Sequence, residues 1–322
     1  MKKRLRIKLK EELKNLAKRL NLKDLSEALY FPKYFEVETI RACNAKCKMC
    51  TIHEWKNKNN RMTDNLFYKI AEEMSNYNQW INRVCLSRNG EPLLDKTLEQ
   101  KIRKLKDYGI KEVSFSTNAS ILNEKRSVSL IESGLDDIRF SIDGITKKTF
   151  EYIRGGLDYE QVKNNCLKFI QLRNQYGKKP KIHIRMTLQD ANKHEEKEWK
   201  DYWVLRILES DIVSSKPMHS WGNQLKNYEK TKQDKEDSLP CISPFSTMII
   251  HFNGKVPLCG CDYNNEIILG KVSKESIKKI WQGTKYQEIR KIHETKGRNE
   301  IPLCVGCNIW DVAGKKEYKG EK

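Results

Sequence analysis

Three cysteines near the start of the chain have the spacing of a metal site. Cys43, Cys47 and Cys50 follow the pattern C-x3-C-x2-C directly after a predicted strand. Thiolates this close in sequence can face one centre from a single loop, and a four-iron cluster takes one ligand on each iron. Three ligands leave one iron open to bind another molecule, as catalytic zinc sites leave one position open. The spacing therefore favours an open iron–sulfur cluster over its main competitor, a zinc ion.

A second group of cysteines lies near the C-terminal end. It comprises Cys241, Cys259, Cys304 and Cys307. Four thiolates occupy every iron of a four-iron cluster, and they suit a structural zinc ion equally well, so the spacing leaves both metals open. Cys261 lies two residues beyond Cys259 and is interpreted as an alternative ligand, a hydrogen-atom donor or a spare thiol.

The bulk composition limits where these thiols can work. The 322-residue chain contains ten cysteines, no apolar run of about twenty residues and no signal-peptide pattern. Cysteines in such a chain are more often metal ligands than disulfides, and we expect a cytoplasmic protein. The formal net charge of +19 suits either a polyanionic partner or a lysine-rich solvated surface. Since no RNA-binding motif is visible, we expect no stable nucleic-acid partner.

Alternating strand and helix patterns follow the first cysteines. Candidate strands cover residues 35–40, 83–87, 112–116, 137–142, 181–187 and 211–215. Helical patterns between them cover 64–76, 98–108, 124–133, 147–153, 161–176 and 195–208. This alternation predicts an α/β fold with a parallel sheet and outer helices. Six units predict a partial (β/α)6 barrel, whose chemistry belongs in the loops after the C-terminal ends of the strands.

The two ends of the chain depart from this alternation. Residues 1–33 are predicted to be a basic helical extension, whose leucine stripe either packs onto the protein or lies on a membrane surface. The stripe comprises Leu5, Leu9, Leu13, Leu16 and Leu20. The barrel is expected over 34–221, followed by a linker over 222–240, a small cysteine-rich module over 241–313 and a tail over 314–322.

Within the module, local signals predict a hairpin and one helix. The hairpin joins strands 246–252 and 255–259 through Asn253-Gly254, a dipeptide that favours tight turns. The helix is expected over 276–292. So short a module has little apolar core, so we expect a bound metal to stabilise it.

Short motifs after successive strands resemble those of the radical S-adenosylmethionine (SAM) superfamily. The cysteine loop is followed by Asn89-Gly90-Glu91-Pro92, Ser116-Thr117-Asn118, Ser141-Ile142-Asp143-Gly144 and Ile153-Arg154-Gly155-Gly156. The family motif has glycine where this chain has Asn89, and it usually has an aromatic residue where this chain has Met49. The resemblance covers about residues 34–220 and implies a partial barrel.

This resemblance also implies a role for each motif. The three cysteines would hold a [4Fe–4S] cluster whose open iron binds SAM. Met49 would contact the adenine, and Arg154 would pair with the methionine carboxylate. The methionine amino group would be held by Asn89, Gly90 and Glu91. The other SAM-binding positions that the resemblance implies are Ser116, Asn118, Ser141 and Asp143.

The C-terminal module is similar to the twitch form of the SPASM domain. Gly254-x4-Cys259, Ile280-Trp281 and the final C-x2-C carry this likeness. It implies one auxiliary [4Fe–4S] cluster on Cys241, Cys259, Cys304 and Cys307, and hence two clusters in all. The gaps between these cysteines resemble those of aminocyclitol and aminoglycoside dehydrogenases and dehydratases.

Together the resemblances imply a radical SAM oxidoreductase, dehydratase or epimerase. A 5′-deoxyadenosyl radical would abstract hydrogen from a carbinol carbon of a sugar, aminocyclitol or glycan precursor. A one-electron reductant such as flavodoxin or ferredoxin would drive the reaction. Radical modification of a peptide or protein is the alternative, and nucleic-acid modification is a further one. Outside catalysis, the competing interpretation is an iron–sulfur electron-transfer or zinc scaffold protein.

A few more residues are candidates for contact with the substrate. His219, Trp221 and Asn223 follow the sixth predicted strand. His219 is the candidate acid–base group or hydroxyl ligand, and Cys261 is the candidate hydrogen donor. Arg185, on the fifth predicted strand, is expected to bind an anionic group or SAM.

Overall fold

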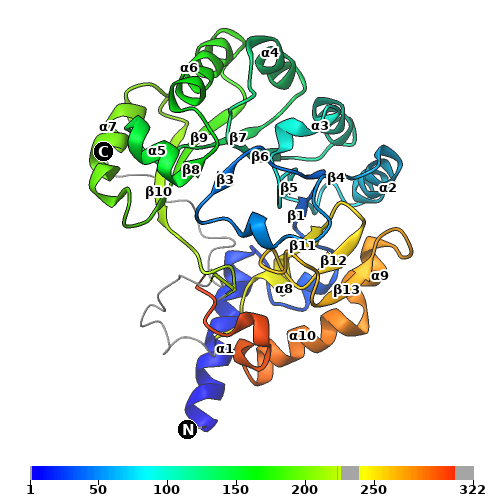
Figure 1. The fold of residues 1–322 in the computed structure, drawn as a ribbon. Helices are drawn as coiled ribbons and strands as arrows, with labels where there is room; N and C mark the ends of the chain where they lie inside the picture. Colours follow the sequence, from blue (N-terminus) through cyan, green and yellow to red (C-terminus); the bar gives the residue numbers. More distant parts are fainter. Residues whose placement is uncertain (1, 223, 226–238, 309–322) are drawn as a thin grey trace. The chain divides into compact units, whose positions relative to one another are not determined.

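The computed structural model describes residues 2–222, 224–225 and 239–308 (Figure 1). They divide into two compact units. The barrel unit contains residues 37–218. The cysteine-rich unit joins the N-terminal residues up to 36 to the described residues from 219 onward. Asn223, most of the predicted linker and the predicted tail over 314–322 lie outside the described residues.

The barrel unit is built on a parallel sheet. Its strands are β5 (Arg83–Cys85), β6 (Val113–Thr117), β7 (Asp137–Ser141), β9 (Lys181–Leu188) and β10 (Ile212–Pro217). They are hydrogen-bonded in chain order, and each neighbouring pair is parallel. The C-terminal ends of all these strands therefore meet at one edge of the sheet. The predicted α/β partial barrel is confirmed.

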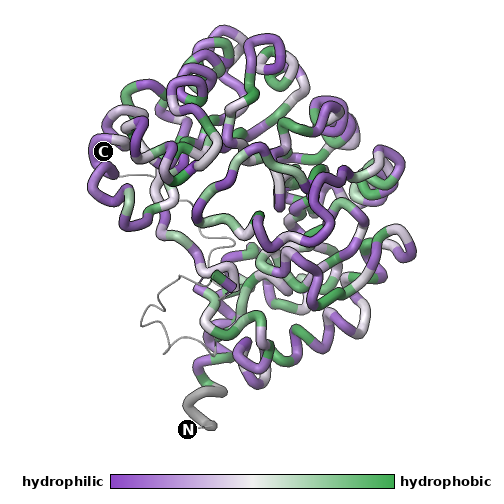
Figure 2. The backbone as a smooth tube through the Cα atoms, in the orientation of Figure 1, coloured by the Kyte–Doolittle hydropathy of each residue, from purple (hydrophilic) through white to green (hydrophobic). Residues whose placement is uncertain are grey.

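Helices connect these strands and cover the outside of the sheet (Figure 1). They are α2 (Asp64–Ser75), α3 (Leu98–Asp107), α4 (Glu124–Glu132), α5 (Lys147–Ile153), α6 (Tyr159–Gln175) and α7 (Glu196–Val204). In α3, Leu98, Ile102 and Leu105 are buried at helical spacing. In Figure 2, hydrophobic and hydrophilic residues likewise alternate along the helical tubes. The apolar stripe, more than local propensity, holds each helix on the sheet.

Side-chain caps define where several helices begin. Thr63, Asn123 and Asp158 each accept a hydrogen bond from the backbone N–H three residues later. Such caps satisfy donors that have no partner within the helix. The helix starts expected at 64 and 124 agree with this, and α6 begins two residues earlier than expected because Asp158 caps it.

The cysteine-rich unit contains short elements from both ends of the chain. They are α1 (Lys2–Arg19), the 3-10 helix η1 (Glu27–Leu29), β1 (Tyr34–Val37), α8 (Ser243–Ser246), β11 (Thr247–Ile250), β12 (Lys255–Pro257), β13 (Ile268–Lys271), α9 (Ile277–Gln282), α10 (Thr284–Thr295), and the 3-10 helices η6 (Arg298–Glu300) and η7 (Pro302–Cys304). Val37, the last residue of β1, already belongs to the barrel unit. Strands β1 and β11 are neighbours in one sheet, and β12 pairs with β13 in an antiparallel ladder.

The structure corrects two local predictions in this unit. The turn at Asn253-Gly254 forms, with Gly254 at φ +77°, but β12 pairs with β13 and not with β11. β13 was not predicted, because its sequence, Ile-Leu-Gly-Lys, is short and carries a glycine. The single helix expected over 276–292 is two helices, since Gly283 adopts an extended backbone (φ −70°, ψ 163°) between α9 and α10.

The N-terminal helix belongs to the cysteine-rich unit and is not a separate extension. α1 packs against α10, and Leu9, Leu16 and Leu20 are buried. After the helix, the indole N–H of Trp281 donates to the carbonyl oxygen of Ala28 (2.7 Å). Three of the five leucines in the stripe are thus covered by the protein itself, which was one of its two predicted uses. None of the described helices is long and apolar enough to cross a membrane.

Candidate metal centres

A buried ion pair anchors the start of the first cysteine loop. Arg41 Nη1 lies 3.1 Å from Glu38 Oε1, and both side chains are almost completely buried. Arg41 Nε also donates to the carbonyl oxygen of Lys56 (2.9 Å). The two ends of the segment that carries the cysteines are therefore tied together by one guanidinium. The pairing of β2 (Ile40–Arg41) with β4 (Asn60–Arg61) closes the same segment.

A two-residue ladder fixes the middle of the loop. β3 (Lys46–Cys47) pairs with β8 (Arg154–Gly155), which brings Cys47 opposite Arg154. Arg154 Nη1 lies 3.7 Å from Cys47 Sγ. Arg154 Nε donates to Asp143 Oδ2 (2.5 Å), and the other oxygen of this carboxylate accepts from the backbone N–H of Thr187 (2.6 Å). The structure thereby joins two predicted SAM-binding residues to a predicted cluster ligand.

The three thiols of the loop gather at one place. Burial, with negative charge on Glu91, Cys47 and Cys50 adding to the shift, raises the pKa of Cys43 to about 12. Burial also raises the pKa of Cys50 to about 11, with Cys47 adding to the shift and Arg154 opposing it. Because thiols that influence one another in this way lie close together, a shared metal centre is chemically reasonable. Binding a metal would replace the protons that burial keeps on the sulfurs.

A glycine lets the loop after β5 approach the cysteine loop closely. The backbone N–H of Glu91 donates to the carbonyl oxygen of Ala42 (2.8 Å). A β-carbon at Gly90 would lie 2.4 Å from the carbonyl oxygen of Ile40 and 2.9 Å from that of Ala42. Any side chain at Gly90 would therefore push the two loops apart.

The carboxylate of Glu91 already has three hydrogen-bond donors. It accepts from Thr117 Oγ1 (2.6 Å) and from the backbone N–H groups of Asn118 (2.8 Å) and Leu93 (3.0 Å). A carboxylate offers about four acceptor positions, so most of its capacity joins the end of β5 to the end of β6. Burial raises the pKa of Glu91, and these hydrogen bonds oppose the shift.

Asn118 connects the end of β6 to the cysteine loop. Its Nδ2 donates to Asn44 Oδ1 (3.0 Å), and its Oδ1 accepts from Ser120 Oγ (2.7 Å). Asn44 Nδ2 in turn donates to Ser120 Oγ (2.7 Å). Asn44 lies between two cysteines in sequence, so its position next to the ligands was the signal for its role. Sequence reasoning did not select it.

Three further predicted residues lie at the same edge of the sheet. Ser141, the last residue of β7, is paired in register with Arg185 of β9. The backbone N–H of Ser116, on β6, donates to Ser87 Oγ (3.1 Å). The side chains of Ser116, Ser141 and Arg185 are half-buried, as is that of Met49 in the cysteine loop. Asn89, by contrast, is fully buried.

The four cysteines of the second group also come together, although they come from distant parts of the chain. Burial, with charges on Cys307 and Cys259 adding to the shift, raises the pKa of Cys241 to about 12. Burial raises the pKa of Cys304 well above its usual range, with the other three thiols adding to the shift. Cys241 precedes α8, Cys259 follows β12, and Cys304 ends η7. The fold therefore assembles a four-thiol group from three separated segments.

Cys261 is a fifth thiol in this group. It is 2 % exposed. Its side chain is hydrogen-bonded to Cys259 and Cys307, and these bonds, followed by burial, raise its pKa well above the usual value. Gly222 supports this arrangement, because a β-carbon there would lie 2.8 Å from the carbonyl oxygen of Leu303 and 3.3 Å from Cys261 Cβ.

Two basic side chains lie beside these thiols. The backbone N–H of Cys241 donates to His293 Nδ1 (3.0 Å). Burial, with the charge of Arg298 adding to the shift, lowers the pKa of His293 to about 4. Arg298 is 1 % exposed and donates to the carbonyl oxygen of Leu239 (3.0 Å). Sequence reasoning selected neither residue, since a buried arginine or histidine has no local signature.

His219 lies in an aromatic group of the cysteine-rich unit. Its ring centroid is 4.5 Å from that of Trp221, and Trp221 contacts Tyr263 edge-on at 6.0 Å. His219 Nδ1 accepts from the backbone N–H of Trp221 (3.3 Å). Both His219 and Trp221 are half-buried, while Tyr263 is 2 % exposed. Tyr263 stands two residues beyond Cys261, so this group lies near the second set of thiols in sequence.

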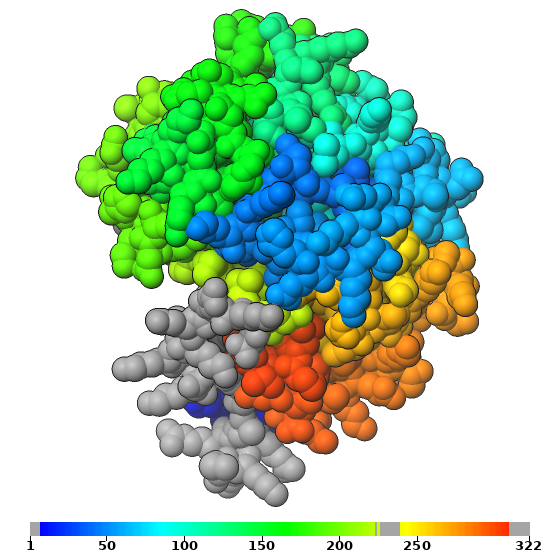
Figure 3. All heavy atoms as spheres, in the orientation of Figure 1, coloured from blue at the N-terminus to red at the C-terminus, as the bar shows by residue number. Residues whose placement is uncertain are grey.

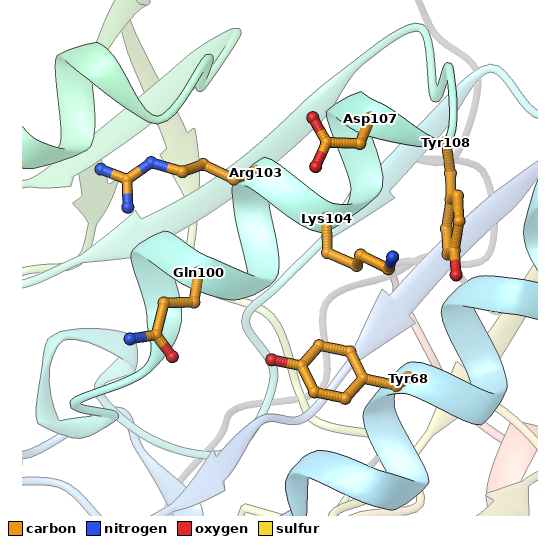
Figure 4. Close-up of a pocket in the computed structure, with 6 residues that line it drawn as sticks. All are labelled: Tyr68, Gln100, Arg103, Lys104, Asp107 and Tyr108. Atoms are coloured by element: carbon orange, nitrogen blue, oxygen red, sulfur yellow. The ribbon is translucent and has the colours of Figure 1, made fainter.

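A pocket on the outside of the barrel unit lies apart from the predicted residues. It is lined by Tyr68, Gln100, Arg103, Lys104, Asp107 and Tyr108. Tyr68 comes from α2 and the others from α3 and its C-terminal end (Figure 4). Lys104 Nζ lies 4.2 Å from the ring centroid of Tyr108. None of its lining residues is a predicted ligand, and it is not part of the candidate centres.

The two thiol groups fit iron–sulfur clusters in number and chemistry. The first offers three thiols beside polar side chains, and the second offers four thiols with a fifth in contact. Within the described part of the chain, no three His, Cys, Asp or Glu side chains converge on a point for a single metal ion. Thiolates that each bind a different iron need no such convergence.

Comparisons with known proteins agree with both groups. The radical SAM superfamily matches residues 37–195, and an iron–sulfur cluster-binding domain (SPASM) matches residues 241–308. The chain is 24% identical over 285 residues to the S-adenosyl-L-methionine-dependent 2-deoxy-scyllo-inosamine dehydrogenase of Niallia circulans. This match covers 88% of the chain and 95% of that protein.

Solved structures show the same fold. BtrN in complex with AdoMet and 2-DOIA superimposes with a TM-score of 0.62 at 21% identity, over 90% of this chain and 98% of that one. SuiB of Streptococcus suis, bound to its precursor peptide SuiA, superimposes with a TM-score of 0.66 at 14% identity, over 83% and 69%. The chain therefore belongs to the radical SAM superfamily and carries a C-terminal SPASM iron–sulfur cluster-binding domain.

Proposed function

We propose that the chain oxidises a carbinol carbon of a small polyhydroxylated substrate, of the aminocyclitol, sugar or glycan-precursor class. The observation that carries this proposal is the match to an aminocyclitol dehydrogenase along nearly the full length of both proteins. At 285 residues, that match is longer than the barrel unit and extends into the cysteine-rich unit. A shared barrel alone would support radical chemistry without favouring any substrate.

The barrel unit supplies the residues for SAM and its cluster. Cys43, Cys47 and Cys50 would hold the cluster, and bound SAM would supply a 5′-deoxyadenosyl radical, which is the chemistry of this superfamily. Arg154 lies beside Cys47 with its charge held by Asp143. We infer that this guanidinium orients the methionine carboxylate. The predicted contacts of Met49, Ser116, Ser141 and Arg185 with SAM or an anionic group remain part of this proposal.

Glu91 has a different role from the one that the family resemblance implies. Its carboxylate is engaged by three donors from Thr117, Asn118 and Leu93. We therefore assign the methionine amino group to the backbone of Asn89 and Gly90. In this assignment Glu91 positions that backbone.

The second thiol group would hold an auxiliary [4Fe–4S] cluster, which makes two clusters in the protein. Oxidation of a carbinol removes a hydrogen atom, a proton and an electron from the substrate, and the radical takes only the hydrogen atom. An auxiliary cluster is a suitable acceptor for the electron. Burial of the thiols favours a low-dielectric site from which water is excluded, and the nearby charge of Arg298 favours the thiolate form of Cys241 and Cys304.

His219 is the proposed proton acceptor or hydroxyl ligand. It is half-buried and its ring lies tilted against that of Trp221, so its orientation is restricted. Aromatic faces next to a hydrogen-bonding imidazole suit a ring that carries both C–H and O–H groups. Cys261 would matter in a different outcome, epimerisation, where a thiol returns a hydrogen atom to the substrate radical.

The test is a substrate survey with the anaerobically reconstituted protein, SAM and dithionite. The panel contains 2-deoxy-scyllo-inosamine, other aminocyclitols, nucleotide sugars and peptides. A hydroxylated substrate should raise 5′-deoxyadenosine above the substrate-free level and lose two hydrogens. Deuterium placed on its carbinol carbon should appear in 5′-deoxyadenosine. Loss of water would instead show dehydration, and unchanged mass with inverted configuration would show epimerisation.

Peptide modification is the competing function in this survey. The likeness to peptide-bound SuiB concerns the fold, at 14% identity. A response to peptides alone would replace the proposed substrate class and leave the radical chemistry intact. Nucleic-acid modification predicts tight RNA or DNA binding that weakens steeply with salt. Weak binding that does not depend on salt would remove that possibility.

A further inference from the structure

We propose that the outer face of the first cysteine loop is the docking surface for an acidic one-electron carrier protein. This lysine face consists of Lys46, Lys48, Lys56, Lys58 and Tyr152. The inference concerns delivery of the electron to the cluster of the barrel unit. It does not depend on the substrate, because reductive cleavage of SAM can be followed without one.

The backbone of β3 separates the cluster ligand from the solvent. Side chains alternate along a strand, and here Lys46 and Lys48 are exposed while Cys47, between them, is only 8 % exposed. Both sequence neighbours of a predicted ligand thus carry a positive charge on the solvent side. A partner that touches these lysines is separated from Cys47 by little more than one strand.

The positive charge continues along the same segment. Residues 46–61 contain four lysines and Arg61 but one acidic residue, Glu54. Lys56 and Lys58 are exposed. Figure 3 shows this part of the chain, in blue, on the visible surface. Arg61 pairs with Asp64 (2.7 Å), whereas in the described part of the chain no carboxylate lies within ion-pair distance of Lys46 or Lys48.

An exposed tyrosine gives this lysine face an apolar point of contact. Tyr152 is 56 % exposed, and Lys48 Nζ lies 3.3 Å from the centroid of its ring. The backbone N–H of Lys48 donates to the carbonyl oxygen of Ile153 (3.0 Å), which holds the two segments together. Tyrosine is enriched at the energetically important centres of protein interfaces. The exposed tyrosine therefore offers an apolar anchor, and the lysine on its ring offers a positive charge for an acidic partner.

The chemistry of the site selects the kind of partner. The family's reaction consumes one electron for each SAM cleaved, and this electron must enter next to the three cysteines. Electron-transfer encounters use small interfaces, below about 1,200 Å². Complementary charge then raises the association rate and depends on ionic strength. The carrier loses one electron and the loaded protein gains it, with no bond made to the lysines.

The test compares Lys46→Gln/Lys48→Gln with the unaltered chain. The probe is a bacterial flavodoxin, used oxidised for calorimetric binding and reduced through its reductase for turnover. Binding at low salt should weaken about tenfold, and the salt dependence should become shallower. The rate of 5′-deoxyadenosine formation should fall with reduced flavodoxin but stay unchanged with dithionite.

A control variant removes the same charge elsewhere on the barrel unit. Lys178 and Lys179 are exposed and precede β9, at the edge of the sheet opposite the cysteine loop. Lys178→Gln/Lys179→Gln should leave flavodoxin binding and turnover unchanged. Equal weakening by the two double variants would overturn the proposal and point to general electrostatic attraction.

Two further outcomes would also overturn it. If Lys46→Gln/Lys48→Gln slows the dithionite-driven reaction equally, the lysines support the site and do not bind a carrier. The variant Lys56→Gln/Lys58→Gln repeats the measurement at lysines that lie farther from the ligands in sequence. These substitutions should not disturb the site itself. If single-stranded RNA or anionic vesicles bind to this face while flavodoxin does not, the partner is not an electron carrier.

Discussion

The two thiol groups of this protein differ in how the chain builds them. The first comes from one ten-residue loop, Arg41 to Cys50, and polar residues from three neighbouring strand ends surround it. The second is collected from three segments that are separated by as many as 45 residues, with Arg298 and His293 beside it. One group can be formed locally, whereas the other requires the tertiary fold.

This difference corresponds to a difference in chemistry. Around the first group, Arg154 and the backbone after β5 offer charge and hydrogen bonds to a small molecule. The second group has more thiols than a four-iron cluster needs and is closed by Cys261. An open site for SAM and a closed site for electrons are the two kinds of centre that the proposed oxidation uses.

Removing the thiols of either group should separate the two centres most clearly. Cys43→Ala/Cys47→Ala/Cys50→Ala should abolish 5′-deoxyadenosine formation and lower the iron content from about eight to about four per chain. Cys241→Ala/Cys304→Ala should lower the iron content similarly but leave SAM cleavage detectable, while product formation stops. The measurements are anaerobic iron and sulfide analysis with chromatography of the nucleoside.

A different iron and zinc content would contradict the proposal that both thiol groups hold iron–sulfur clusters. If the unaltered protein holds about four irons and zinc, and the triple variant loses all the iron, the second group binds a structural metal. The electron-acceptor role of that group would then be dropped. SAM cleavage by the first group would not be affected.

Arg154 provides the next largest expected effect. Its partner Asp143 is fully buried, and removal of one member of a buried ion pair commonly costs about 3–5 kcal/mol. Arg154→Gln should therefore lower the unfolding temperature of the barrel unit and weaken SAM binding at least about tenfold. Thermal denaturation and equilibrium dialysis with labelled SAM measure these effects.

The double variant Arg154→Gln/Asp143→Asn separates the two contributions. It removes the buried charge together with its partner, so stability should recover partly. SAM affinity should stay low, because the guanidinium is still missing. If SAM affinity recovers with stability, Arg154 supports the fold and does not bind SAM.

Sequence reasoning succeeded where the information was local. The cysteine loop was selected for its spacing, and Asn118 and Asp143 for motifs that resemble the family's. All lie directly after strands, and parallel strands bring such positions to one edge. Sequence reasoning failed where a contact joins residues that are far apart in the chain. The contact of Trp281 with Ala28 joins the segment after the N-terminal helix to the C-terminal module. No periodicity within either segment encodes that contact.

The role of Glu91 illustrates a subtler limit. Its place in a family-like motif led to the expectation that its carboxylate holds the methionine. In the structure, hydrogen bonds from Thr117, Asn118 and Leu93 occupy most of the carboxylate, and we infer from this that the adjacent backbone holds the amino group. A motif identifies the position, whereas the partners of a side chain depend on neighbours that only the fold brings near.

Two glycines allow the same change to be made at each centre. Gly90→Ala would place a β-carbon 2.4 Å from the carbonyl oxygen of Ile40, and Gly222→Ala would place one 2.8 Å from that of Leu303. Relief of such overlap costs about 1–3 kcal/mol. Gly90→Ala should reduce SAM affinity and spare the second cluster, while Gly222→Ala should do the reverse. Electron paramagnetic resonance with and without SAM distinguishes them.

A control glycine tests whether the effect is steric. Gly177 also has a positive φ (+99°), but a β-carbon there would meet nothing within 4 Å. Gly177→Ala should cost about 1–2 kcal/mol of backbone strain and change neither cluster signal. Loss of either signal in Gly177→Ala would show that the readout follows general stability.

The fifth thiol predicts the smallest effect and the sharpest contrast between the groups. Because Cys261 is hydrogen-bonded to both Cys259 and Cys307, it can replace Cys259 after a small movement. Cys259→Ala alone should therefore keep most of the iron, whereas Cys259→Ala/Cys261→Ala should lose about four atoms per chain. No spare thiol is predicted beside Cys47, so the single substitution Cys47→Ala should be enough to lose the first cluster. If Cys259→Ala and the double variant lose iron equally, Cys261 is not a reserve ligand, and its thiol is free for hydrogen donation to a substrate.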